Sequence, residues 1–193
     1  MREYPQANIQ KTSLALKECI AGNVSDIFII GSSIKNKISP NDIDIVVLFK
    51  DKNLKYVEDT LLFVKEKMDE LRLGEVHIEH IFADSFMKEG LFFSVFHEGF
   101  SIKYGKRVSE LQGFDSYSLF TYGLNMLSKD EKVKFSHVIY GRKKDGLLFK
   151  NHGKQLGAGS FMIPVENEEI LKEALAKWNI KFTASRVIVK RNI

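Results

Sequence analysis

The chain has 193 residues, of which 44% are hydrophobic and 28% are charged, a composition typical of a folded, soluble protein. Its single cysteine, Cys19, excludes an internal disulfide and is interpreted as a small core residue. The N-terminal residues lack the apolar run of a signal peptide, and no segment approaches the roughly 18 apolar residues of a membrane span. We therefore expect a cytoplasmic protein of one large or two small domains, with no membrane partner.

The formal net charge of +4 is distributed unevenly along the chain. Residues 1–108 contain 15 Lys/Arg and 16 Asp/Glu, whereas residues 109–193 contain 14 Lys/Arg and 9 Asp/Glu. A nearly neutral first part followed by a basic second part would suit an anionic substrate that is held by both. The alternative interpretation is that these lysines only solvate the surface.

The first 108 residues alternate between helical and strand patterns. Apolar residues recur at three- and four-residue intervals in residues 7–21 and 54–72, which predicts two amphipathic helices, with Gly74 capping the second. Apolar runs and alternation predict strands at residues 26–30, 43–49, 75–82 and 101–104, and the phenylalanine-rich residues 83–97 predict a helix. The pattern favours an α/β (α+β) fold in which helices pack on one face of a small mixed sheet.

Residues 109–193 are expected to form a smaller α+β domain after a linker at residues 106–114. The helices that we predict here span residues 115–127, 129–140 and 166–178, with Ser128 as the N-cap of the second. Glycines indicate hairpin-like turns around residues 147–149 and 161–163, and a strand is predicted at residues 181–189. The sequence thus predicts two domains, residues 1–108 and 109–193.

The segment from Ile27 to Phe49, IFIIGSSIKNKISPNDIDIVVLF, is the most informative part of the sequence. It predicts an apolar strand, a turn at Gly31-Ser32, and a second strand that opens with Asp42-Ile43-Asp44. Because side chains alternate along a strand, both aspartates are expected on one face, with Cα atoms roughly 6.5 Å apart. Two adjacent carboxylates repel each other, and a pair of divalent cations would turn that repulsion into attraction.

This arrangement resembles the signature of the polymerase beta-like nucleotidyltransferase superfamily, and its small "minimal" members in particular. The resemblance covers about residues 1–108 and implies the nucleotidyltransferase fold. It implies that Asp42 and Asp44 are catalytic and bind Mg²⁺ in a two-ion site that also accepts Mn²⁺. It also implies that Gly31, Ser32 and Ser33 hold the triphosphate of a nucleoside triphosphate such as ATP, because backbone amides and a hydroxyl at such a turn form an anion cradle.

A third carboxylate on a neighbouring strand completes the site in that superfamily, and Glu79 has the expected apolar-acid setting. The resemblance implies that Glu79 binds the metal near the acceptor hydroxyl and accepts its proton. His80 follows it where an apolar residue is more usual, and an exposed glutamate without a role is the alternative. His77, two residues before Glu79, could tune this acid or contact substrate.

Lys35 and Lys37 lie between the two halves of the motif, where many relatives have an Arg-Gly pair. Lys35 is a candidate nucleotide-binding residue because its charge would neutralise phosphate, and the alternative is a solvated loop lysine. A zinc site at His77 and His80 is not favoured, because neighbouring side chains on a strand point to opposite faces.

The most basic stretch of the sequence is Tyr140-Gly141-Arg142-Lys143-Lys144, with Lys150, His152 and Lys154 following it. Aromatic and basic residues interleaved in this way suit contacts with a nucleic-acid backbone, and a solvated basic loop is the alternative. In residues 83–97, the helical spacing of the phenylalanines indicates a core or an interface rather than a platform for bases.

The sequence therefore predicts a Mg²⁺-dependent, ATP-binding nucleotidyltransferase, an enzyme that moves a nucleoside monophosphate to an acceptor hydroxyl. The acceptor is RNA, a protein or a small molecule, and the basic second domain would help to select an RNA or protein acceptor. The alternatives are a non-catalytic nucleic-acid-binding protein and an antitoxin-like interaction protein that retain the same fold. A pure binding protein would not need the pair of aspartates.

Overall fold

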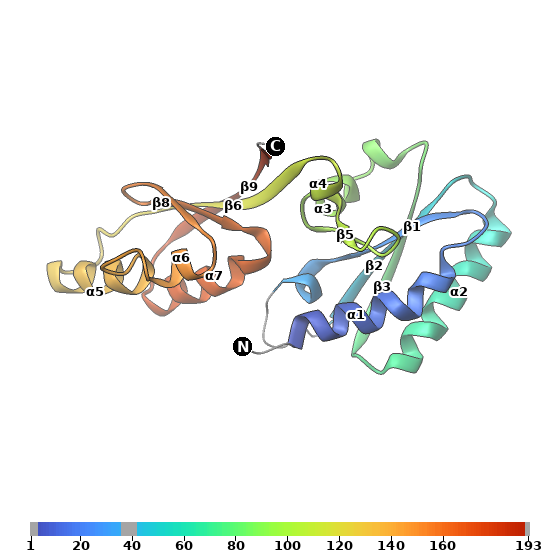
Figure 1. Ribbon diagram of the computed structural model, residues 1–193, viewed down its shortest axis with the longest axis horizontal. Coiled ribbons are helices and arrows are strands. Elements are labelled where there is room, and N and C mark those ends of the chain that lie inside the picture. The colour runs from blue at the N-terminus through green and yellow to red at the C-terminus, as the bar shows by residue number, and fades with distance from the viewer. Residues whose placement is uncertain (1–3, 36–41, 192–193) are drawn as a thin grey trace. The chain divides into compact units, whose positions relative to one another are not determined.

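The computed structural model describes residues 4–35 and 42–191, and the side chains of residues 9–35 and 42–191. The fold is α+β (Figure 1). The chain divides into two compact units, Met1–Gly113 and Phe114–Ile193, each with its own mixed layers of helix and sheet. Among the described residues, no helix is both long and apolar enough to cross a membrane.

The first unit is built on a five-stranded sheet with the strand order β3-β2-β1-β4-β5. Its strands are β1 (Val24–Ile30), β2 (Asp42–Phe49), β3 (Glu75–Phe82), β4 (Phe100–Ser101) and β5 (Lys106–Arg107). Strands β1 and β2 are antiparallel, whereas β2 and β3 are parallel, so the sheet is mixed, as the sequence predicted.

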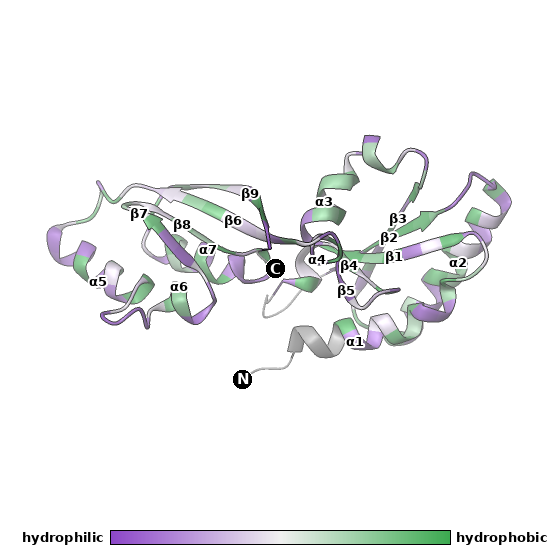
Figure 2. Ribbon diagram, turned by 45° about the horizontal axis from the view of Figure 1, so that its top comes forward, coloured by the Kyte–Doolittle hydropathy of each residue, from purple (hydrophilic) through white to green (hydrophobic). Residues whose placement is uncertain are grey.

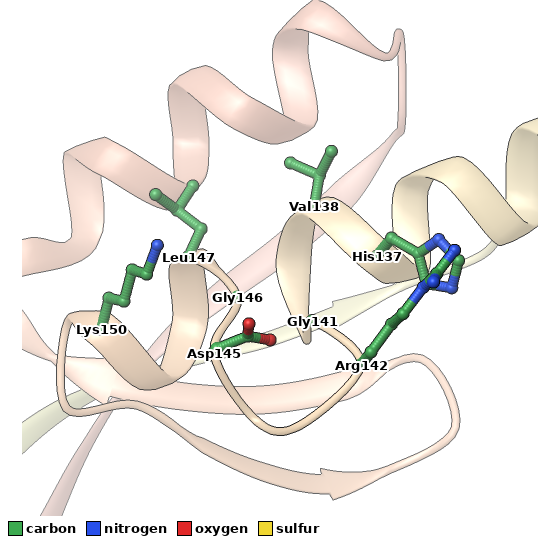
Figure 3. A pocket seen from close by; sticks show the side chains of 8 residues that line it. All are labelled: His137, Val138, Gly141, Arg142, Asp145, Gly146, Leu147 and Lys150. Atoms are coloured by element: carbon green, nitrogen blue, oxygen red, sulfur yellow. The ribbon is translucent and has the colours of Figure 1, made fainter.

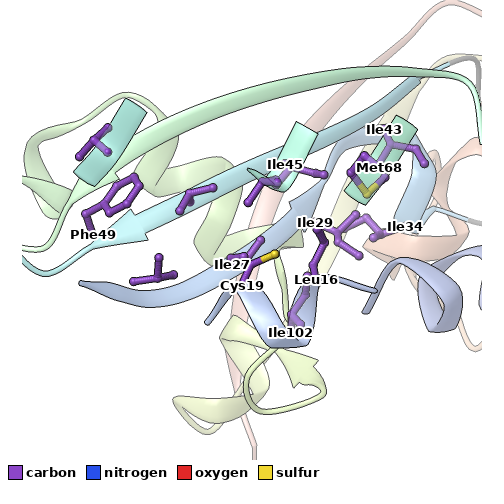
Figure 4. Close-up of a cluster of buried hydrophobic side chains, with 14 residues drawn as sticks. Leu16, Cys19, Ile27, Ile29, Ile34, Ile43, Ile45, Phe49, Met68 and Ile102 are labelled. Atoms are coloured by element: carbon purple, nitrogen blue, oxygen red, sulfur yellow. The ribbon is translucent and has the colours of Figure 1, made fainter. Parts of the chain in front are cut away.

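Helices cover both faces of this sheet, whereas the sequence predicts them on one face. Helices α1 (Tyr4–Leu16) and α2 (Leu54–Leu71) pack on the face that carries Ile29, Ile45 and other apolar residues (Figure 4). Helix α3 (Leu91–Glu98) packs through Val95 on the opposite face. The expectation was wrong because alternate residues of β1 and β2 are apolar on both faces, and each face needs a cover.

The helix in the phenylalanine-rich segment is shorter than expected. Instead of one helix over residues 83–97, a 3₁₀ turn at Phe86–Lys88 precedes α3, which begins after Gly90. Similarly, α2 is not capped by Gly74: the C-cap is Arg72, which has a left-handed backbone with φ of 50°. Helix ends depend on local backbone geometry that periodicity does not encode.

The segment predicted to be a short strand and a linker is folded. The expected strand at residues 101–104 is a small hairpin of β4 and β5, in which Phe100 pairs with Arg107. Residues 106–114, expected as a linker, contain β5 and a helical turn, α4 (Val108–Leu111). The peptide N–H of Val108 donates to the carbonyl of Gly99, which ties this segment to the first unit.

The second unit is a four-stranded antiparallel sheet with the order β7-β8-β6-β9. Its strands are β6 (Phe114–Tyr122), β7 (Lys154–Gly157), β8 (Ser160–Pro164) and β9 (Phe182–Lys190), and its helices are α5 (Lys129–Ile139), α6 (Leu147–Lys150) and α7 (Glu168–Lys177). Figure 2 shows hydrophobic stretches within the strands of both units. In the second unit, Phe120 and Phe161 from the sheet pack with Phe135 and Leu171 from the helices to form the core.

Two expectations for the second unit are wrong and others are confirmed. Residues 115–127, expected as a helix, contain most of β6, and residues 147–149, expected in a hairpin, begin α6. The predicted helix at residues 129–140 is confirmed as α5. Its predicted N-cap is confirmed too, since Ser128 forms a reciprocal capping box with Glu131. The predicted helix over residues 166–178 begins as a 3₁₀ turn and continues as α7, and the predicted final strand is confirmed as β9.

Candidate metal and nucleotide site

The Gly-Ser turn and the paired aspartates lie at the same end of the sheet. Strand β1 ends at Ile30 and leads into a 3₁₀ turn, Gly31–Ile34, while β2 begins at Asp42. Because β1 and β2 are antiparallel and Ile30 pairs with Asp44, the turn lies beside the start of β2.

Gly31 is required by its close contact with Asp44. Its φ is +77°, and a Cβ atom at this position would lie 2.1 Å from the Asp44 Oδ2 atom. Any other residue would therefore be strained in its backbone and would collide with the carboxylate. The backbone of the turn and the second aspartate consequently form one compact group.

Asp42, Asp44 and His77 form a cluster that could hold a cation. One ligand atom from each of the three side chains lies within 4.8 Å of the other two. The parallel register brings this about, because Asp44 on β2 is the direct partner of His77 on β3. Asp42 and Asp44 are half-buried and His77 is exposed, so the cluster is open to solvent on one side.

Burial and neighbouring acids both disfavour the charged form of Asp44. Its pKa is raised, first by burial and then by the negative charge of Asp42. Glu79 and Glu98 add to this effect, and only His77 opposes it. Among the described residues, no group donates a hydrogen bond to the Asp44 carboxylate. A divalent cation beside Asp42 and Asp44 would favour the charged form of both carboxylates.

Glu79 lies on the same face of the sheet but outside the cluster. It pairs with Val46, two residues along β2 from Asp44, and its side chain is exposed. It is near enough to raise the pKa of Asp44. His77, not Glu79, therefore lies beside Asp44, a difference that depends on the register between two strands far apart in sequence.

The serines of the turn have different partners. The Ser32 hydroxyl donates to Asp42 Oδ1 over 3.2 Å, so it faces the acids. Ser33 is buried, and its hydroxyl donates to the carbonyl of Ile30 over 3.2 Å. Ser32 is thus placed to contact a ligand beside the aspartates, whereas Ser33 holds the turn together.

Lys35 is paired with an acid that sequence reasoning missed. Its Nζ atom lies 2.7 Å from Glu98 Oε2 at the end of α3, and the two side chains are only 12% and 14% exposed. Glu98 is also one of the groups that raise the pKa of Asp44. Glu98 therefore pairs with Lys35 and also acts on the charge of Asp44. Lys37 lies outside the described residues.

No model of a known protein family matches the sequence, and a comparison with curated proteins finds no match either. The function must therefore be argued from the arrangement of these side chains.

Proposed function

We propose that this protein is a Mg²⁺-dependent nucleotidyltransferase whose first unit has the fold of the polymerase beta-like superfamily. The single observation that carries the proposal is the meeting of Gly31, Ser32, Asp42 and Asp44 at one end of β1 and β2. A phosphate-accommodating turn beside an under-compensated pair of carboxylates is suited to a metal-bound triphosphate.

The aspartates fit divalent metal by their chemistry. Carboxylate oxygens are the preferred ligands of Mg²⁺ and Mn²⁺, and burial together with the neighbouring acids raises the pKa of Asp44, which disfavours its charged form without a cation. Asp42 and Asp44 would hold the ions, and Mg²⁺ bound there would neutralise charge on the phosphate oxygens and on the leaving pyrophosphate.

The turn and the exposed strand β3 supply the remaining functions. Gly31 lets the turn lie against Asp44, so the backbone of the turn would border a phosphate held beside the aspartates, and the Ser32 hydroxyl can turn from Asp42 to a phosphate oxygen. The acceptor hydroxyl would form a bond to the α-phosphorus while the bond from that phosphorus to the β-phosphate oxygen breaks. Glu79, exposed on the same face, would accept the hydroxyl proton.

The double substitution Asp42→Asn with Asp44→Asn tests the site. We expect it to abolish Mg²⁺-dependent binding of ATP in isothermal titration calorimetry, because both metal-binding carboxylates are lost. Asp59→Asn with Asp69→Asn is the matched control, since these two exposed aspartates of α2 give the same change in charge. Binding that survives in the Asp42/Asp44 variant would show that the nucleotide site is elsewhere.

Turnover requires a separate experiment. The protein is incubated with each α-phosphate-labelled nucleoside triphosphate, Mg²⁺, cellular RNA and lysate, and the labelled product is identified. We expect one class of acceptor to gain label with the wild type and none with the Asp42/Asp44 variant. Nucleotide binding without any labelled product would instead indicate a binding protein.

A further inference from the structure

The second unit contains a cleft of about 400 Å³ at the end of α5, far along the sequence from the aspartates. Its lining is formed by the last turns of α5, the loop that follows it, and α6 (Figure 3). This volume is in the range of sites that hold small organic groups such as a nucleotide.

Three basic side chains from three elements line the cleft. His137 comes from α5, Arg142 from the following loop and Lys150 from the end of α6. In the view of Figure 3, His137 and Arg142 lie toward one end of the cleft and Lys150 toward the other. All three are exposed, and Arg142 and Lys150 form no ion pair within the described part of the chain. The charges of Arg142 and Lys150 are therefore not paired with any acid that the structure describes.

The loop is folded tightly around two glycines. Gly141 has φ of +73°, and a Cβ atom there would lie 2.0 Å from Asp145 Oδ1. A Cβ atom on Gly146 would lie 2.4 Å from the Gly141 nitrogen. Lys144 adopts a left-handed backbone with φ of 57°, which L-residues other than asparagine and aspartate rarely adopt. The loop therefore has one tightly defined shape, which fixes where Arg142 leaves the backbone.

Asp145 is the one acidic residue in the lining of this cleft. Its Oδ1 atom accepts a hydrogen bond from the Lys143 peptide N–H over 3.3 Å and lies against Gly141. The carboxylate therefore serves the shape of the loop, and the cleft keeps an excess of positive charge.

We propose that this cleft binds a backbone phosphate of a single-stranded nucleic acid. Arg142 and Lys150 would flank one phosphate, and His137 would donate a hydrogen bond from its ring. Lys143 and Lys144 are exposed on the same loop, so positive charge continues beyond the cleft. A row of cations matches an extended polyanion better than it matches a single small anion. The site stands independently of the reaction proposed for the first unit.

Fluorescence anisotropy with a short fluorescein-labelled single-stranded RNA tests the proposal. Arg142→Gln with Lys150→Gln removes both charges and keeps side chains of similar polarity. We expect roughly tenfold weaker binding, and a plot of log K against log salt that is shallower by about 0.7, since each neutralised phosphate contributes about 0.7 for a single strand and the two side chains share one phosphate. Lys177→Gln with Lys181→Gln is the matched control, because these exposed lysines do not line the cleft.

Equal losses in the two double variants would overturn the proposal, because they would reveal a general effect of charge. Failure of the wild type to bind RNA or the corresponding single-stranded DNA would overturn it as well. Similar affinity for RNA and DNA would support recognition of the phosphate backbone. Binding of inorganic phosphate alone, without binding of either strand, would exclude a nucleic-acid ligand.

Gly141→Ala provides a second test that leaves every charge in place. The added methyl group collides with Asp145 and distorts the loop, so RNA binding should fall severalfold while the net charge is unchanged. Unchanged binding in this variant would show that the shape of the loop has no part in recognition. Calorimetric titration of ATP should be unaltered in all these variants, which separates this cleft from the aspartate site.

Discussion

Asp26 and Asp44 lie at opposite ends of the same pair of strands, and their surroundings differ. Asp26 is 5% exposed and receives three hydrogen bonds: from the Ile27 peptide N–H at 2.7 Å, the Ser101 hydroxyl at 2.6 Å and the Lys103 peptide N–H at 3.1 Å. Asp44 is half-buried, and Asp42, Glu79 and Glu98 raise its pKa further. Within residues 4–35 and 42–191, Asp26 therefore has several hydrogen-bond donors and Asp44 has none.

Burial raises the pKa of both carboxyl groups, so a raised pKa alone does not separate a structural acid from a functional one. At Asp26, the hydrogen bonds from Ser101, Lys103 and Ile27 act against burial. At Asp44, the neighbouring acids act in the same direction as burial. The hydrogen-bond donors and charges around a buried acid, more than its burial, therefore indicate whether it is suited to bind a cation.

The second unit contains an acid of the first kind. Glu168 is fully buried at the start of α7, yet it pairs with Arg186 and Lys172 and accepts a hydrogen bond from Ser118. These partners join α7 to strands β6 and β9. Arg142 and Lys150 in the cleft differ from Glu168 as Asp44 differs from Asp26, because these two cations form no ion pair with the described residues.

The largest expected effect of this difference is on stability. Replacing Asp26 by alanine leaves three donors without their acceptor and should lower the free energy of unfolding by about 3 kcal/mol. Asp44→Ala removes a repulsive charge that accepts no hydrogen bond from the described residues, so the change should stay below about 1 kcal/mol in the absence of divalent metal. Urea unfolding of both variants measures the difference, and equal losses would refute the distinction.

Most strands of the first unit could be predicted from the sequence, because the patterns that indicate them are local. Strand β3 coincides with the predicted residues 75–82, and β2 with 43–49 to within one residue, because apolar runs and alternation repeat over short distances. Residues 115–127 were wrongly predicted as a helix, because a short run of serines, apolar residues and aromatics fits both the 3.6-residue period of a helix and the two-residue period of a strand. Their place in the centre of a sheet, between β8 and β9, depends on contacts with distant strands.

In the candidate site, too, relations within one strand could be predicted from the sequence, whereas relations between distant elements could not. That Asp42 and Asp44 share a face follows from the geometry of a single strand, and the structure places both in one cluster. That His77 lies beside Asp44 depends on the register of β2 with β3, and that Glu98 meets Lys35 depends on how α3 packs. Neither relation has a local signal in the sequence.

A smaller effect is expected from Mg²⁺ on thermal stability. Since the folded-state pKa of Asp44 is raised, this group's contribution to stability is present below its unfolded pKa and is lost as pH rises through the folded value. Mg²⁺ should restore stability at neutral pH, by about 1.4 kcal/mol or roughly 4 °C in Tm at ten times its Kd. The gain should fade on acidification, because protons compete for the same oxygens.

Differential scanning fluorimetry across a pH series, with and without Mg²⁺, measures this gain. Asp44→Ala should show none at any pH, whereas Asp59→Ala, which removes an exposed acid of α2, should keep it. An undiminished gain in Asp44→Ala would place the ion elsewhere.

The smallest expected effect distinguishes the two candidates for the third ligand. His77 has a ring nitrogen within 4.8 Å of both aspartate oxygens, whereas Glu79 lies beside Val46. His77→Ala should therefore weaken Mn²⁺ binding about threefold, or about 0.7 kcal/mol, while Glu79→Gln should leave it nearly unchanged. Calorimetric titration with Mn²⁺ measures both. The reverse ranking would mean that the Glu79 carboxylate reaches the ion on binding and that His77 serves the substrate instead.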